Sequence, residues 1–193
     1  MTLGQFFFKY RSYTPVPFLI PLFLFARPTI LTMAIGFVFV LIGQIVRFWG
    51  VSYAGSETRT RNVGASALVT QGPFAYSRNP LYLANILIYF GFGLMANSLA
   101  PFLVIIGLAY FIFQYYHIIL EEEKTLREKF KDKYGDYFQS VNQLIPRTTP
   151  YHPAKQSKLK LDFKAGYKSE KRTLQANLTV VVCIYIVYIL INQ

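Results

Sequence analysis

Two polar stretches interrupt an otherwise apolar sequence, and they contain the residues best suited to chemistry. The first, residues 68–85, has a single charged side chain, Arg78, set among glycine, proline and aromatic residues. A guanidinium group can bind a carboxylate through two parallel hydrogen bonds. The aromatic rings of Phe74, Tyr76 and Tyr82 can stack on a purine or surround an onium cation. We interpret this stretch as the mouth of an intramembrane site; a structural turn at the membrane interface is the alternative.

The second stretch begins with three consecutive glutamates, residues 121–123, and ends at Arg147. Three consecutive helical residues spread over most of the helix circumference, so at least one carboxylate must point toward the bundle. Gln114 and His117 lie upstream on the same stripe as Glu121. A carboxylate that faces a cavity at the membrane surface suits a cationic ligand. The alternatives are a solvated helix end for the glutamates and a hydrogen-bonded interfacial histidine for His117.

The composition indicates a membrane protein. Of the 193 residues, 53% are hydrophobic and 18% are aromatic, which leaves too little polar surface for a soluble domain of this size. Lys and Arg number 20 against 9 Asp and Glu, a balance that nucleic-acid binding could also explain. The basic residues crowd beside apolar segments, as they do on cytoplasmic loops, so we expect no nucleic-acid partner.

Five apolar segments predict an all-α polytopic bundle of about five transmembrane helices within a single domain, residues 1–193. The first segment is short for a span of ~20 residues and contains three prolines, so it must borrow residues 6–8, tilt, or be partly re-entrant. The third and fourth segments are joined by a tight turn and form a helical hairpin. The segments are residues 13–26, 29–53, 81–96, 99–120 and 173–191.

The basic residues predict the orientation of the chain. With a cytoplasmic N-terminus, five spans place 13 basic residues between Lys124 and Arg172 on the cytoplasmic side, and Arg27 on the other. The connector, residues 148–172, is basic and is predicted to contact anionic lipid headgroups. The same orientation places Arg78 on the cytoplasmic side, together with four basic residues of the N-terminus and the loop before residue 68: Lys9, Arg11, Arg59 and Arg61.

Arg47 lies inside the second apolar segment, three residues after Gln44 and on the same helix face. Its long side chain can extend to the membrane interface. Alternatively it faces a polar cavity, as intramembrane charges usually do.

Several common site types are not indicated. Cys183 is the single cysteine, so neither a disulfide framework nor a cysteine metal site is expected, and His117 and His152 are too few and too distant for a metal cluster. The chain has no Walker loop and no GxGxxG motif, which argues against a Rossmann nucleotide domain.

The ordered motifs of the two polar stretches resemble the isoprenylcysteine carboxyl methyltransferase and phospholipid methyltransferase superfamily. The resemblance covers about residues 43–147, with a helical hairpin between the motifs, and includes Arg-Phe-Trp at residues 47–49. The basic connector and the last apolar segment lie outside it. In chain order the motifs are GPFAYSRNPLY at 72–82, EEKTL at 122–126, Tyr134, Tyr137 and IPR at 145–147.

This resemblance implies an integral-membrane enzyme that binds S-adenosylmethionine without a Rossmann fold, at the cytoplasmic ends of the third and fourth helices. Arg47 and Arg78 are candidates to orient an acidic acceptor, and Glu122 is the third candidate catalytic residue. The residues implied or assigned to the cofactor pocket are Gln71, Tyr76, Arg78, Asn79, Pro80, Tyr82, Asn85, His117, Glu121, Glu122 and Glu123.

The sequence departs from the superfamily pattern at three places. Asn79 replaces a histidine, so the position keeps hydrogen bonding but loses a titratable ring. Tyr82-Leu83-Ala84 replaces Tyr-x-Gly. Phe130-Lys131 replaces an aromatic-glycine turn, which Tyr134-Gly135 is predicted to restore further along.

The sequence therefore predicts methyl transfer from S-adenosylmethionine to a lipophilic acceptor, such as an isoprenoid, a prenylated cysteine or a phospholipid. A carboxylate acceptor needs no base, whereas an amine or a thiol does. Two alternatives remain open: a sterol-reductase-like membrane enzyme that uses NADPH, and a non-enzymatic protein that binds lipid or a partner.

Overall fold

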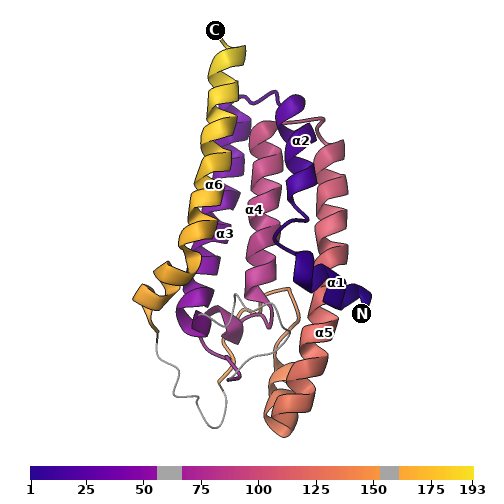
Figure 1. Cartoon of the computed structure of the whole chain (residues 1–193). Coiled ribbons are helices and arrows are strands. Elements are labelled where there is room, and N and C mark those ends of the chain that lie inside the picture. The colour runs from indigo at the N-terminus through magenta and orange to yellow at the C-terminus, as the bar shows by residue number, and fades with distance from the viewer. Residues whose placement is uncertain (56–66, 153–160) are drawn as a thin grey trace.

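The computed structural model describes residues 1–55, 67–152 and 161–193. These residues form helices and no strand, so the prediction of an all-α bundle is confirmed. Helices α2 to α6 stand side by side, and α1 lies across α5 (Figure 1). The helices are α1 (Leu3–Tyr10), α2 (Val16–Leu24), α3 (Ile30–Ala54), α4 (Pro80–Ala96), α5 (Phe102–Ser140) and α6 (Phe163–Ile191).

Three helices, α3, α5 and α6, are long and apolar enough to cross a membrane, and α4 is a shorter apolar helix of 17 residues. The apolar part of α5 ends at Leu120, where the charged sequence begins. The first apolar segment is divided: α2 has nine residues, about 13 Å of helix, against a hydrocarbon core of ~30 Å. Residues 6–8 belong to α1 and therefore do not lengthen α2.

Local sequence explains the helix ends. The Thr29 hydroxyl accepts a hydrogen bond from the Thr32 amide at 3.2 Å and caps α3. Pro80 occupies the first turn of α4, where its missing N–H costs nothing. Asn97 ends α4 in the left-handed conformation (φ 48°, ψ 38°), and the chain turns directly into α5. The predicted hairpin is therefore present.

Helices α3 and α4 pack closely because glycines remove side chains from their contact. A Cβ atom added to Gly36 would lie 2.5 Å from the carbonyl oxygen of Gly91, and one added to Gly43 would lie 2.7 Å from that of Ala84. Small residues at such contacts let two backbones approach each other. This pair of helices forms a rigid base for the residues of α4 that face the cavity described below.

The charged end of α5 bends at Lys131, which has a non-helical backbone (φ 43°, ψ −119°). The prediction that Tyr134-Gly135 restores the turn was wrong, because the turn lies at Lys131, where the superfamily pattern has glycine. After Ser140 the chain returns along the loop before α4. Backbone hydrogen bonds join the Arg78 amide to Asn142 O (2.9 Å) and the Arg147 amide to Tyr76 O (2.9 Å).

Candidate functional site

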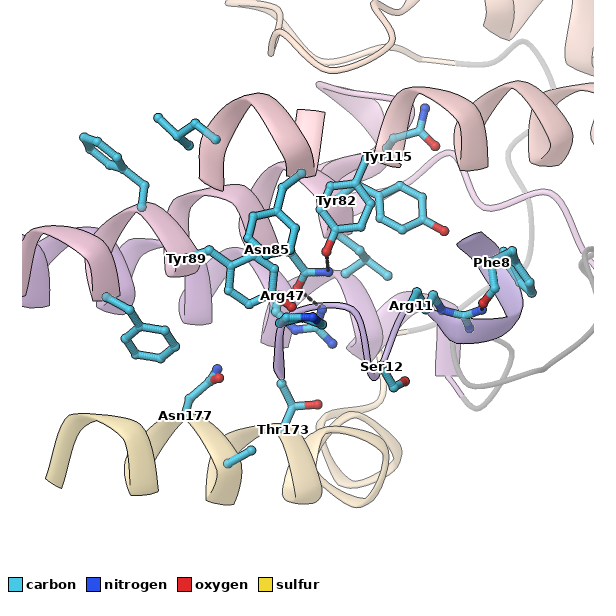
Figure 2. Close-up of a pocket in the computed structure, with 18 of the residues that line it drawn as sticks. Phe8, Arg11, Ser12, Arg47, Tyr82, Asn85, Tyr89, Tyr115, Thr173 and Asn177 are labelled. Atoms are coloured by element: carbon cyan, nitrogen blue, oxygen red, sulfur yellow. Dashed lines mark hydrogen bonds between the residues drawn. The ribbon is translucent and has the colours of Figure 1, made fainter. Parts of the chain in front are cut away.

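A cavity of about 660 Å³, a size typical of small-molecule sites, lies between α2, α4, α5 and α6, and α1 and α3 contribute Phe8 and Arg47 to its lining (Figure 2). One end is polar and lies where the charged part of α5 begins. The other end is apolar and is enclosed by Leu19, Leu22, Phe92, Leu103, Val104 and Val180. The polar end is lined by Arg11, Arg47, Arg78, Asn79, Tyr82 and Glu122.

The polar end is built around Glu122 and two stacked tyrosines. The Tyr82 hydroxyl donates a hydrogen bond to Glu122 Oε1 at 2.9 Å. The rings of Tyr82 and Tyr115 stack with centroids 4.8 Å apart. Asn85 Nδ2 donates to the Tyr115 hydroxyl at 3.1 Å, so α4 and α5 are joined by polar contacts along the cavity wall (Figure 2).

Arg47 faces the same cavity, as the second of its two predicted alternatives proposed. Its Nε donates to Glu170 Oε1 at 2.7 Å, and its Nη2 donates to Glu170 Oε2 at 3.1 Å. The third nitrogen donates to Asn85 Oδ1. Because the Glu170 side chain is fully buried, the charge of Arg47 is compensated inside the protein. The guanidinium thus connects α6 to the tyrosines of α4 and α5.

Arg78 holds the loop before α4 against the end of α5. Its Nε donates to Glu123 Oε1 at 2.9 Å, and its Nη1 donates to the carbonyl oxygens of Phe138 (2.8 Å) and Val141. The guanidinium also lies 4.1 Å from the centre of the Phe138 ring. This fork of contacts positions the loop in addition to lining the cavity.

Asn79 has a similar anchoring geometry. Its backbone amide and its side-chain Nδ2 both donate to the carbonyl oxygen of Gln143, each at 3.2 Å. The Ser77 hydroxyl donates to the same oxygen at 3.2 Å. Asn79 therefore lines the cavity while its amide nitrogen is used to fasten the loop.

The three consecutive glutamates diverge, because neighbouring helical residues point about 100° apart. Glu122 faces the cavity, Glu123 faces Arg78, and Glu121 accepts a hydrogen bond from the Thr2 hydroxyl of the N-terminal segment. His117 lies on the α1 side of α5, with its ring 6.4 Å from that of Phe7. Among the predicted pocket residues, those that do not line the cavity are Gln71, Tyr76, Pro80, His117, Glu121 and Glu123.

Burial raises the pKa of the Glu122 carboxyl from its ordinary value to about 7. The hydrogen bond from Tyr82 and the positive charge of Arg11 act in the opposite direction. Glu122 lies just beyond the apolar part of α5, which ends at Leu120. Its carboxyl group can therefore gain or lose a proton near neutral pH.

Some site residues escaped sequence reasoning. Tyr134 lines the cavity and is 1% exposed, and its hydroxyl has no hydrogen-bond partner among the described residues. The motif that contains Tyr134 was recognised, but nothing in the sequence indicated a direction for its hydroxyl. Glu170 lies in the basic connector, and nothing in the sequence indicated that its side chain is buried beside Arg47. Asn177 of α6 donates to Gln44 Oε1 at 2.8 Å, which gives the polar face of α3 a second partner.

Comparisons with known proteins give one family and two curated relatives. A family model described as phospholipid methyltransferase matches residues 31–133. The cobalt-zinc-cadmium resistance protein CzcN of Cupriavidus metallidurans is 30% identical over 122 residues, which cover 63% of this chain and 52% of that protein. The nickel-cobalt-cadmium resistance protein NccN of Alcaligenes xylosoxydans xylosoxydans is 29% identical over 115 residues, covering 60% and 50%. The chain thus spans about half the length of these relatives, and no solved structure matches it.

Proposed function

The chain belongs to the phospholipid methyltransferase family, and on this premise we propose that it transfers a methyl group from S-adenosylmethionine to a lipophilic acceptor at the membrane surface. The observation that carries this proposal is the placement of the Glu122 carboxylate beside the stacked rings of Tyr82 and Tyr115. A carboxylate and aromatic faces together attract an onium cation.

The residues of the cavity fit this cofactor. The volume of the cavity, about 660 Å³, lies within the range of ligand pockets. The buried Tyr134 hydroxyl lacks a partner among the described residues, and a buried unpaired polar group costs ~1–3 kcal/mol. A polar ligand atom beside Tyr134 would remove that cost. Tyr134 and Glu122 would then contact two different polar parts of the cofactor.

S-adenosylmethionine, when bound, supplies a methyl group on a positively charged sulfur. The cavity is lined largely by apolar side chains, so a nucleophile and a cation meet there with less solvent to rearrange than in bulk water. Glu122 can accept the proton that an amine or a thiol acceptor loses, since its pKa lies near neutrality. Glu122 is therefore our candidate base.

The pairing of the two arginines favours a neutral nucleophile over a carboxylate acceptor. Arg47 is compensated by Glu170, and Arg78 is compensated by Glu123. A buried arginine that already has a carboxylate partner attracts a second carboxylate only weakly. We therefore infer that Arg47 and Arg78 position the walls of the cavity, and that the acceptor is an amine or a thiol on a lipophilic body.

We also propose that the polar end of the cavity and the N-terminus face the cytoplasm. The exposed side chains Lys164, Lys168 and Lys171 on the first turns of α6 support this orientation, because basic residues favour the cytoplasmic side. At that surface they would contact anionic lipid headgroups. Cysteine accessibility labelling of Lys164→Cys from each side of sealed vesicles tests the orientation.

Calorimetry on the purified full chain in detergent tests the proposal. We expect S-adenosylmethionine to bind the wild type, and Glu122→Gln to weaken binding or abolish turnover. Glu121→Gln is the matched control, because its carboxylate lies one residue away and does not line the cavity. Failure of the wild type to bind S-adenosylmethionine would overturn the proposal, and binding of NADPH would favour a reductase.

A second candidate function follows from the names of the two relatives, which describe metal resistance. Among the described residues, no group of three or more His, Cys, Asp or Glu side chains could hold a metal ion. We propose that any resistance role works through the same cavity. Complementation of a metal-sensitive strain by the wild type and by Glu122→Gln tests this, and equal rescue by both would separate resistance from the cavity.

A further inference from the structure

The apolar end of the cavity continues along α5 well beyond the polar site. Tyr115 is the last residue of this α5 wall with a polar side chain, and the lining then continues through Phe111, Gly107 and Leu103. Twelve residues of helix separate Tyr115 from Leu103, about 18 Å at the usual rise. One leaflet of a bilayer core measures about 15 Å. The apolar end is thus as long as a single hydrocarbon chain of the membrane.

The walls of this apolar end come from helices on both sides of α4. Leu19 and Leu22 of α2 line one side, and Ala176 and Val180 of α6 line the other. Figure 1 places α2 and α6 on opposite sides of α4. These four side chains are apolar, and Asn177, the polar lining residue next to Ala176, already donates its amide to Gln44 Oε1. The occupant that matches this space is therefore an extended hydrocarbon chain whose polar headgroup lies at Glu122.

Gly107 interrupts this wall. It is buried, it lines the cavity, and the nearest atom to a Cβ placed there is Phe18 Cδ1 of α2, at 3.9 Å. That distance is an ordinary van der Waals contact, so a methyl group fits without displacing a neighbour. A longer side chain at position 107 would enter the cavity about 12 Å along α5 from Tyr115, two-thirds of the way to Leu103.

We propose that Gly107 determines how long a hydrocarbon chain the cavity accepts. The inference rests on the proposed function, because it assigns the chain to the lipophilic acceptor. The absence of a side chain at position 107 leaves the last third of the apolar end open. Filling that third should exclude the end of a long chain and leave a short chain unaffected.

Binding of n-alkylamines to the full chain in detergent micelles tests the proposal without requiring turnover. The probes share one cationic headgroup and differ in chain length, and they displace a fluorescent dansyl-alkylamine. Each probe also partitions into the micelle, to the same extent for both proteins. The ratio of the affinities of Gly107→Leu and the wild type at one chain length is therefore independent of this partition. We expect equal affinity for short chains and a loss of about fourfold for each methylene group that no longer enters.

Gly135→Leu is the matched control, because it makes the same substitution in the same helix and a Cβ there has no atom within 4 Å. We expect this variant to follow the wild type at all chain lengths. An affinity ratio for Gly107→Leu that is the same at every length, or no binding of any n-alkylamine to the wild type, would overturn the proposal.

Gly107→Ala keeps the test decisive if Gly107→Leu does not fold. Alanine raises helix propensity and its methyl group has room, so this variant should fold. Its expected loss is confined to the longest probes. A wild type that shows chain-length selection but does not bind S-adenosylmethionine would refute the methyltransferase proposal and leave the role of Gly107 in place.

Discussion

Arg47 of α3 and Glu170 of α6 form a two-bond ion pair inside the bundle, with donor–acceptor distances of 2.7 and 3.1 Å. The Arg47 side chain is 14% exposed and that of Glu170 is 0% exposed. Glu170 lies beyond the residues that match the family, which end at residue 133. Helix α6 therefore supplies the counter-charge for Arg47, a residue of the part of the chain that matches the family.

Removing Glu170 should destabilise the protein strongly. Glu170→Gln leaves the Arg47 guanidinium buried without a counter-charge, which typically costs ~3–5 kcal/mol. The double variant Arg47→Met, Glu170→Met should lose less than the sum of the two single variants, because it buries neither charge. Unfolding by sodium dodecyl sulfate in mixed micelles measures these free energies. Simple additivity of the single effects would show that the pair does not couple α3 to α6.

The proton chemistry of Glu122 should appear in the pH dependence of turnover. If Glu122 accepts a proton, turnover rises with a midpoint near pH 7 and levels off above it, where the carboxylate form dominates. Tyr82→Phe removes a hydrogen bond that lowers the pKa of Glu122, so the midpoint should move to higher pH. Glu121→Gln should keep the wild-type profile, and an unchanged profile in Glu122→Gln would exclude Glu122 as the base.

The raised pKa of Glu122 also makes the free energy of unfolding depend on pH. The folded pKa of Glu122 lies above the ordinary value of 4.5, so the folded state binds the proton more tightly than the unfolded state. This contribution to stability is full below pH 4.5 and is lost as the pH rises through about 7. Glu122→Gln should flatten the dependence of the unfolding free energy in that window.

The sequence predicted the helical bundle, the α4–α5 hairpin and the polar loop because hydrophobic length, Pro80 and the Asn97 turn are local signals. It could not tell which of three adjacent glutamates faces the cavity, because that depends on the rotation of α5 against α4. Nor could it pair Arg47 with Glu170, since 123 residues separate them along the chain. The fold of α1 across α5 was missed for the same reason: it depends on a contact between distant segments.

Tyr134 should show opposite effects on stability and on ligand binding. Tyr134→Phe removes a buried hydroxyl that has no partner among the described residues, so the free energy of unfolding should stay constant or rise by up to ~1 kcal/mol. If the cofactor contacts that hydroxyl, its affinity should fall by about tenfold, the value of one hydrogen bond of ~1.4 kcal/mol. Thermal unfolding and calorimetry on the same preparation measure both. Unchanged affinity would remove Tyr134 from the cofactor site.

His117 was predicted to bind the cofactor, but its position indicates that substituting it should leave cofactor affinity nearly unchanged. Its ring lies 4.6 Å from that of Phe113, beside α1, and it does not line the cavity. We expect His117→Ala to change the S-adenosylmethionine dissociation constant by less than about twofold, as for distant independent sites. Calorimetry decides this, and a large loss of affinity in a folded variant would return His117 to the site.

Lys131 should be the position where glycine stabilises the protein. Its backbone has φ 43° and ψ −119°, a conformation that glycine adopts freely and that strains a residue with a Cβ by ~1–3 kcal/mol. Glycine loses more backbone entropy on folding, which offsets ~0.5–1 kcal/mol of the gain. Lys131→Gly should therefore raise the unfolding free energy by about 1 kcal/mol and the melting temperature by ~2–4 °C.

Lys133→Gly is the matched control for this substitution. Lys133 is also exposed but lies in regular helix, where glycine costs about 1 kcal/mol. The two variants remove the same charge two residues apart, so a difference of opposite sign isolates the backbone conformation at position 131. Equal destabilisation by both variants, measured by thermal unfolding, would show that the bend at Lys131 does not persist in solution.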